Sequence, residues 1–277
     1  MIMTQEEFQL FNEILDSHFG LCFPESKKEI LGSRLKPRLD TLKMRHYMDY
    51  YFTLQYNSNG SEEISHLARL VTNNESYFFR ETHQFEALFN HALDDIKKTC
   101  ALPGAIRILC AGCSTGEEAY TLNIYAKENL YQMWGYAVEI SAFDIDTDAL
   151  QTAKEAAYGS NSFRFTDSEK LIRYFKKQNE SKHSVKENFR TGINFDQGNI
   201  LKLETYKKLI PYDALFCRNV LIYFSEVSLH KAIDNFAQCL RPGGLLFLGH
   251  SESIIGISDK FESIRLGNCI VYRRTNK

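Results

Sequence analysis

The sequence lacks any long apolar run and any excess of one charge, and both absences restrict its class. No stretch of its 277 residues is long and apolar enough to span a bilayer, so we expect no membrane insertion. The formal net charge of -2 argues against general nucleic-acid binding. The N-terminus becomes acidic at once and has neither the basic start nor the apolar core of a signal peptide, which predicts a cytoplasmic protein.

Cysteine occurs in an odd number, which argues against a disulfide framework. The seven cysteines are scattered through apolar runs, as expected of reduced thiols. Cys110 and Cys113 form a CxxC pair, but the sequence has no second such pair to complete a zinc site. We therefore expect no bound metal and interpret both cysteines as ordinary strand and loop residues.

Residues up to about Asn73 have the pattern of a small helical module. Thr4 and Glu7 form a capping box, and Gly20 is placed to end the first helix. Three more helices are expected before Asn73, with Pro37 bending or interrupting the second.

Residues 25–46 of this module carry a local excess of positive charge. This excess predicts either a solvated helix face or a docking surface for an acidic partner. The basic residues are Lys27, Lys28, Arg34, Lys36, Arg38, Lys43 and Arg45, against Glu25, Glu29 and Asp40.

Alternating strands and helices follow, and their order predicts an α/β protein with a parallel, doubly wound sheet. A longer helix from Glu75 through Leu93 is expected before the first strand. The region from about Tyr158 to Phe195 is polar and charged and is interpreted as an insertion. Strands are predicted at 106–110, 137–143, 213–217, 244–249 and near 269–273.

The first predicted strand breaks into a glycine-rich loop at 111–116 and then a helix, a junction where α/β proteins hold ligands. Residues 112–116 match GxSxG, and Ser114, Asp213 and His250 occur in the order of an α/β-hydrolase triad. The other interpretation is a nucleotide-type cofactor loop, which needs an acid at the end of the next strand. Asp144 supplies that acid, so the loop and acid together favour the cofactor.

Motifs beyond the loop carry a resemblance to a known family. A helix, a Pro-Gly-Gly turn at 242–244 and an apolar strand resemble class I S-adenosylmethionine-dependent methyltransferases. Further motifs closely resemble CheR, the family of chemotaxis receptor glutamate methyltransferases, over nearly the whole chain. They are TNNESYFFRE at 72–81, STGEEAY at 114–120, FDIDTDAL at 143–150, FCRNVLIYF at 216–224 and GHSES at 249–253.

The resemblance implies an architecture and a reaction. It implies an all-helical receptor-docking domain at 1–73 and a Rossmann-like catalytic domain at 74–277, whose mostly parallel sheet carries a small antiparallel β subdomain at about 158–195. A glutamate carboxylate on the cytoplasmic helical bundle of a chemoreceptor attacks the methyl of S-adenosyl-L-methionine, leaving S-adenosyl-L-homocysteine. Because that carboxylate is ionised at neutral pH, no general base is needed. Orientation and desolvation should supply the catalysis.

The resemblance also assigns residues. Arg80, on the helix joining the two domains, and Tyr223 are expected near the transferred methyl. Asp144 is expected on the ribose in preference to Asp146, and Glu118 in preference to Glu117 faces the cofactor. The full set expected around the cofactor is Asn74, Ser76, Arg80, Glu118, Asp144, Asn199, Ile200, Cys217 and Arg218.

Two further expectations concern partners. The inserted segment is short and lacks glycine until Gly192, which argues weakly against tethering by a receptor tail peptide. The chain is expected to act as a monomer. A receptor-docking module that binds the cofactor without turnover stays open as a non-enzymatic alternative.

Overall fold

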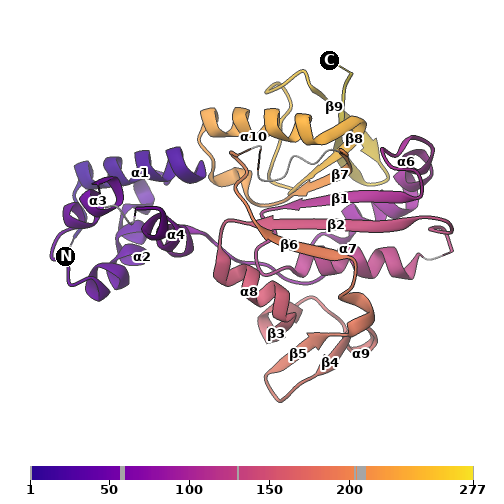
Figure 1. The fold of residues 1–277 in the computed structure, drawn as a ribbon, viewed down its shortest axis with the longest axis horizontal. Coiled ribbons are helices and arrows are strands. Elements are labelled where there is room, and N and C mark those ends of the chain that lie inside the picture. Colours follow the sequence, from indigo (N-terminus) through magenta and orange to yellow (C-terminus); the bar gives the residue numbers. More distant parts are fainter. Residues whose placement is uncertain (1, 57–59, 130, 203, 205–209, 277) are drawn as a thin grey trace.

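The computed structural model describes residues 2–56, 60–129, 131–202, 204 and 210–276. Within those ranges, no helix combines the length and apolar character needed to cross a membrane. Figure 1 shows a helical module beside a larger domain built on a sheet, with a small sheet below it.

The helical module has its own apolar core, to which all of its helices contribute. The predicted capping box is confirmed: the Thr4 hydroxyl accepts from the Glu7 N–H, and Glu7 accepts from the Thr4 N–H. Gly20, at a φ of 78°, ends the first helix. Pro37 lies inside the second helix, which continues past it. The helices are α1 (Gln5–Phe19), α2 (Lys28–Thr41), α3 (Tyr47–Tyr56) and α4 (Gly60–Val71), with a 3-10 turn at Glu25–Lys27.

The described residues of the larger domain form a seven-stranded, mostly parallel sheet in the order β6-β2-β1-β7-β8-β10-β9. Among the described strands of this sheet, β10 runs opposite to the others and pairs antiparallel with β8 and with β9. The predicted strands are confirmed, although β8 already begins at Leu240 and includes the Pro-Gly-Gly residues expected to form a turn. The edge strands β6 and β9 were not predicted. The strands are β1 (Ala105–Ala111), β2 (Ala137–Asp144), β6 (Ile193–Gln197), β7 (Tyr212–Cys217), β8 (Leu240–Leu248), β9 (Phe261–Leu266) and β10 (Cys269–Arg274).

Apolar layers cover both faces of the sheet, because successive strand side chains point to opposite sides. On β1, Ile108 packs into the layer shared with α7 (Glu117–Glu128), whereas Leu109 packs into the layer shared with α10 (Glu226–Cys239). Figure 1 shows α7 and α10 on opposite faces, with α8 (Thr147–Glu155) beside β2 and β6.

The linker between the domains differs from the expected helix that begins at Glu75. Residues 72–77 have no regular structure, and residues 78–81 form a turn. Phe79 and Glu81 have positive φ values of 61° and 54°, which no right-handed helix accommodates. Helical structure begins only at Thr82, so Arg80 lies in a turn and not in a helix. The helical part of the linker consists of α5 (Thr82–Glu86), a π-helical stretch (Ala87–Ala92) and α6 (Leu93–Thr99).

The predicted insertion forms a small antiparallel sheet in the order β3-β5-β4. Its predicted end at Phe195 differs from the structure, since residues 193–197 form β6 and pair with β2 in the large sheet. The alternation of Ile193 and Phe195 with polar residues fits an edge strand with one face packed. The elements of the insertion are β3 (Ala157–Gly159), β4 (Phe175–Lys177), β5 (Lys182–Val185), α9 (Ser168–Tyr174) and 3-10 turns at Ser160–Phe163 and Glu187–Phe189.

Candidate functional site

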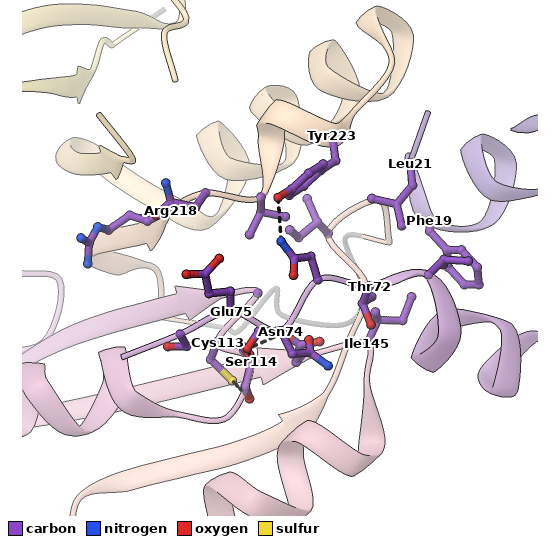
Figure 2. A pocket seen from close by; sticks show the side chains of 18 of the residues that line it. Phe19, Leu21, Thr72, Asn74, Glu75, Cys113, Ser114, Ile145, Arg218 and Tyr223 are labelled. Atoms are coloured by element: carbon purple, nitrogen blue, oxygen red, sulfur yellow. Dashed lines mark hydrogen bonds between the residues drawn. The ribbon is translucent and has the colours of Figure 1, made fainter. Parts of the chain in front are cut away.

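A cavity lies between the helical module and the carboxyl ends of β1, β2 and β7 (Figure 2). Parallel α/β sheets bind ligands at this edge, next to the first strand, where the strand order reverses. One wall comes from the end of α1 and the loop after it, and another from the linker. The glycine loop, the end of β2 and the loop after β7 also line the cavity.

The glycine loop requires its glycines for packing as well as for conformation. Gly112 and Gly116 have φ values of 76° and 91°, in the left-handed region. A Cβ at Gly112 would lie 2.8 Å from a methyl of Val220, and one at Gly116 would lie 2.8 Å from the Cβ of Ala153. Both glycines therefore let neighbouring elements approach closely, and α7 begins directly after the loop.

The acid at the end of β2 is held by the glycine loop itself. The Ser114 N–H donates to Asp144 Oδ2 at 2.7 Å, and the Asp146 N–H donates to Asp144 Oδ1 at 2.9 Å. Burial raises the pKa of Asp144 to about 6. Asp146 instead caps α8 by accepting from the N–H groups of Asp148 and Ala149. Of the two candidate acids, the one that lines the cavity is Asp144.

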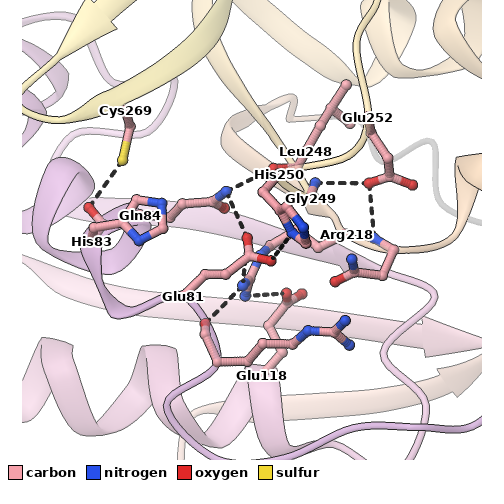
Figure 3. A network of polar contacts seen from close by, with 12 residues as sticks. Glu81, His83, Gln84, Glu118, Arg218, Leu248, Gly249, His250, Glu252 and Cys269 are labelled. Carbon is pink, nitrogen blue, oxygen red and sulfur yellow. Dashed lines mark hydrogen bonds and ion pairs between the residues drawn. The ribbon is translucent and has the colours of Figure 1, made fainter.

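A buried ion cluster lies under the linker, as Figure 3 shows. The Arg218 guanidinium, with its side chain 2% exposed, pairs with Glu118 at 3.0 Å and with Glu81 at 3.2 Å. It also donates to the main-chain oxygen of Arg80 at 2.7 Å. Burial raises the pKa of Glu118. For Glu81, burial is the largest single effect, but the charge of Arg218 and the hydrogen bonds from His250 and Arg218 together outweigh it and lower the pKa. Arg218 thus ties the glycine-loop helix to the linker.

The two neighbouring acids of the loop point in different directions. Glu118 lines the cavity. Glu117 accepts from the hydroxyls of Thr115 and Ser162, away from it. The geometry therefore favours Glu118 as the acid that faces a cofactor.

Arg80, from the linker, and Tyr223, from the loop after β7, line the same cavity. The Arg80 guanidinium donates to the Glu75 main-chain oxygen at 3.2 Å and lies over the Tyr77 ring. The Tyr223 hydroxyl accepts from the Asn73 side chain at 3.1 Å. Both side chains are half-buried, so each keeps a face toward the cavity.

Most of the other expected residues also line the cavity, and one does not. Asn74, Ser76, Asn199 and Ile200 belong to its walls. Cys217 is fully buried and packs in the apolar layer below α10, because as the last residue of β7 its side chain points into that layer. The side chain of Cys217 therefore does not line the cavity, unlike those of the other expected residues.

The helical module supplies cavity residues that the sequence analysis missed. Phe19, Leu21 and Phe23 belong to the wall, as Figure 2 shows for the first two. No spacing or motif marks them, since they come from a different domain. Only the docking of α1 against the loop after β7 brings them to the site.

The hydrolase triad is not assembled. The Ser114 hydroxyl donates to the Asn74 main-chain oxygen, and His250 contacts Glu81. Asp213 lies at the opposite end of the parallel strands, where it accepts from the N–H of Arg107 and from Arg241. The nucleophile-elbow interpretation of Ser114 is therefore wrong, and the loop is a ligand cradle.

The chemistry of the cavity fits S-adenosylmethionine. Asp144 and Glu118 offer acceptors for hydroxyl and ammonium groups, and Arg80 and Arg218 offer cations for a carboxylate. Among the described residues, Arg218 Nε and Asn219 Oδ1 are buried polar atoms without a hydrogen-bond partner. A polar ligand in this cavity would explain why they are tolerated.

Comparisons with known proteins agree with this geometry. Residues 74–270 match the family model "CheR methyltransferase, SAM binding domain", and residues 6–72 match "CheR methyltransferase, all-alpha domain". Chemotaxis protein methyltransferase 2 of Vibrio cholerae is 33% identical, over 100% of this chain and 96% of its own length. Chemotaxis protein methyltransferase 1 of Pseudomonas aeruginosa is 30% identical, with 99% of each chain covered.

The doubly wound sheet, the glycine loop and Asp144 are those of an S-adenosylmethionine-dependent methyltransferase with a Rossmann-like fold. Both family models match, and together they span almost the whole sequence. The chain belongs to the CheR methyltransferase family.

Proposed function

We propose that this chain transfers the methyl group of S-adenosylmethionine to glutamate side-chain carboxylates of chemoreceptors, giving glutamyl methyl esters. Family membership and relatives named as chemotaxis protein methyltransferases support the substrate class. The observation that carries the proposal is one cavity lined both by Asp144 of the glycine-loop site and by Arg80 and Tyr223. We propose that it works in the cytoplasm as a monomer, without nucleic acid or membrane insertion.

Each residue has a role that its position allows. Asp144 accepts from the ribose hydroxyls, and Glu118 faces the amino-acid part of the cofactor. S-adenosylmethionine supplies an electrophilic methyl group when bound. Arg80 orients a carboxylate with its planar guanidinium, and Tyr223 presents a hydroxyl and an aromatic face. Because charge disappears on the way to the transition state, these groups should act through orientation and exclusion of water.

The labelled methyl group gives the direct test. The chain is incubated with methyl-labelled S-adenosylmethionine and receptor-containing membranes. Base-labile label on receptor glutamates is expected. Label on nucleic acid, lysine or a small molecule would contradict the proposal, and cofactor binding without any transfer would support a non-catalytic module.

The pH dependence of cofactor binding is a further prediction. The pKa of Asp144 is raised to about 6, so its carboxylate becomes protonated and loses an acceptor as the pH falls through that value. We expect the dissociation constant of S-adenosylhomocysteine to rise on acidification from about pH 8 to about pH 5. Titration calorimetry measures it. Asp144→Asn, whose side chain does not titrate, should bind more weakly and lose this dependence, and an equal dependence in both proteins would refute the assignment.

We also propose that the helical domain, residues 1–73, docks the receptor, beside the catalytic domain at 74–277. On the basic segment, Arg38 is occupied by an ion pair with Glu63, whereas Lys36 and Lys43 are exposed. The exposed cations are suited to an acidic helical surface. The inserted β subdomain is proposed not to bind a receptor tail.

Charge reversal tests this docking surface. Lys36→Glu should raise the KM for receptor about tenfold at low salt with kcat nearly unchanged, because a lost encounter contact acts on binding. The KM difference should shrink at high salt. Lys176→Glu, on the exposed part of the β subdomain, is the matched control. Equal KM values for both variants would leave α2 as a solvated helix face.

A further inference from the structure

The turn after β8 contains a carboxylate, that of Glu252, to which the proposed mechanism assigns no role. Glu252 in this turn accepts hydrogen bonds from four main-chain N–H groups. Its Oε2 accepts from Gly249 at 2.7 Å and Asn219 at 2.8 Å, and its Oε1 accepts from Val220 at 2.9 Å and Ile222 at 3.2 Å. Figure 3 shows Glu252 beside Gly249, on the far side of Arg218 from Glu118. Such charge-assisted hydrogen bonds are stronger than neutral ones.

Three of these N–H groups, those of residues 219, 220 and 222, lie at the start of a tight turn. Asn219 has a φ of 61°, and a 3-10 turn over Leu221–Tyr223 follows. The first N–H groups of a helical turn have no partner within it. The carboxylate therefore holds the turn whose last residue is Tyr223.

Tyr223 has two further attachments, both to other parts of the chain. Its main-chain oxygen accepts from the Cys22 N–H at 2.8 Å, and its hydroxyl accepts from Asn73 at 3.1 Å. The helical module and the linker thus fix the residue from two directions. Glu252 fixes Tyr223 from a third direction, through the backbone of residues 219–222 that precedes it.

Gly249 shows that the turn is built around this carboxylate. A Cβ at Gly249 would lie 2.9 Å from the Asn219 nitrogen and 2.9 Å from Glu252 Oε2. Real Cβ contacts are essentially never that short, so a side chain would push the two segments apart. The close approach of the β8 turn to the loop after β7 therefore depends on glycine.

We infer that Glu252 is a positioning residue for methyl transfer. It acts through the N–H groups of residues 219, 220 and 222, and it holds Tyr223 in the wall of the cavity that Arg80 also lines. The link to methyl transfer rests on the function proposed above. The inference that Glu252 holds the conformation of the turn is independent of that proposed function.

Glu252→Gln tests the first link. The amide keeps one acceptor oxygen but places an NH2 group against N–H donors. We expect kcat to fall about 10²-fold, as for a reacting group displaced by about 1 Å, and cofactor affinity to change much less. The loss should be smaller in a Tyr223→Phe background, because both changes act on one group. Ser251→Ala, in the same turn, should leave kcat unchanged.

Amide hydrogen exchange tests the second link without any activity. Protection at residues 219, 220 and 222 should fall in Glu252→Gln and also in Gly249→Ala, which keeps the carboxylate but separates the segments. Unchanged protection, or additive effects of Glu252→Gln and Tyr223→Phe on kcat, would overturn the inference. If the wild-type chain fails to methylate receptors while the exchange result holds, the proposed function alone fails.

Discussion

Asp144→Ala is expected to abolish measurable binding of S-adenosylhomocysteine in titration calorimetry. The buried carboxylate is held toward the cavity by the N–H groups of Ser114 and Asp146, so both of its oxygens are oriented before a ligand arrives. Two hydrogen bonds to a charged acceptor correspond to about 10²- to 10⁴-fold in affinity. Alanine also leaves those two N–H groups without their partner.

The matched control is Asp148→Ala, two residues into α8. Its side chain is 72% exposed and pairs with Arg69 on the surface. A surface ion pair contributes little, so the control should bind the nucleoside as the wild type does. Wild-type affinity in Asp144→Ala would refute the assignment of this acid to the ribose.

Arg218→Ala is expected to destabilise the protein by about 3–5 kcal/mol, because it leaves two buried carboxylates without their cation. The side chains of Glu81 and Glu118 are only 13% and 15% exposed. Urea unfolding monitored by circular dichroism measures the difference. Part of the loss should be recovered at acidic pH, where both carboxyl groups become neutral.

Arg173→Ala provides the comparison for this experiment. Its ion pair with Glu128 is on the surface, and its own side chain is 54% exposed. Removing it should change the free energy of unfolding by less than about 1 kcal/mol. Equal effects of the two substitutions would show that the buried cluster contributes no more than an exposed pair.

The sequence predicted the parts of the fold whose signals are local. The strand, loop and helix around Gly112 are encoded within a few residues, and so is the capping box at Thr4. The edge strand β6 escaped prediction because only one of its faces packs, so its apolar residues are few. The left-handed backbone conformation of Glu81 explains why the linker is not a helix there. Glutamate does not favour that conformation, so the sequence gives no signal for it.

The candidate site was predictable only where the family motifs reach. Asp144 and Glu118 follow from the strand and loop that carry them, and both line the cavity. The side chain of Cys217 packs in the core instead of lining the cavity, because a motif shows proximity in sequence but not the direction of a side chain. The role inferred for Glu252 could not be read from sequence, since three of its four partners are main-chain N–H groups about 30 residues away.

The cavity is shared between two domains that contact each other beside it. The segment after α1 contacts the loop after β7 through a β-bridge between Leu21 and Phe224. Asp16, in the last turn of α1, accepts from the hydroxyls of Ser225 and Ser228. A nucleoside bound in the cavity would contact both domains at once. By thermodynamic linkage, a ligand that binds only the docked arrangement of the two domains stabilises it against their separation, and the stabilisation grows with ligand concentration. Saturating nucleoside should therefore merge the thermal melting of the helical module with that of the sheet into one cooperative transition.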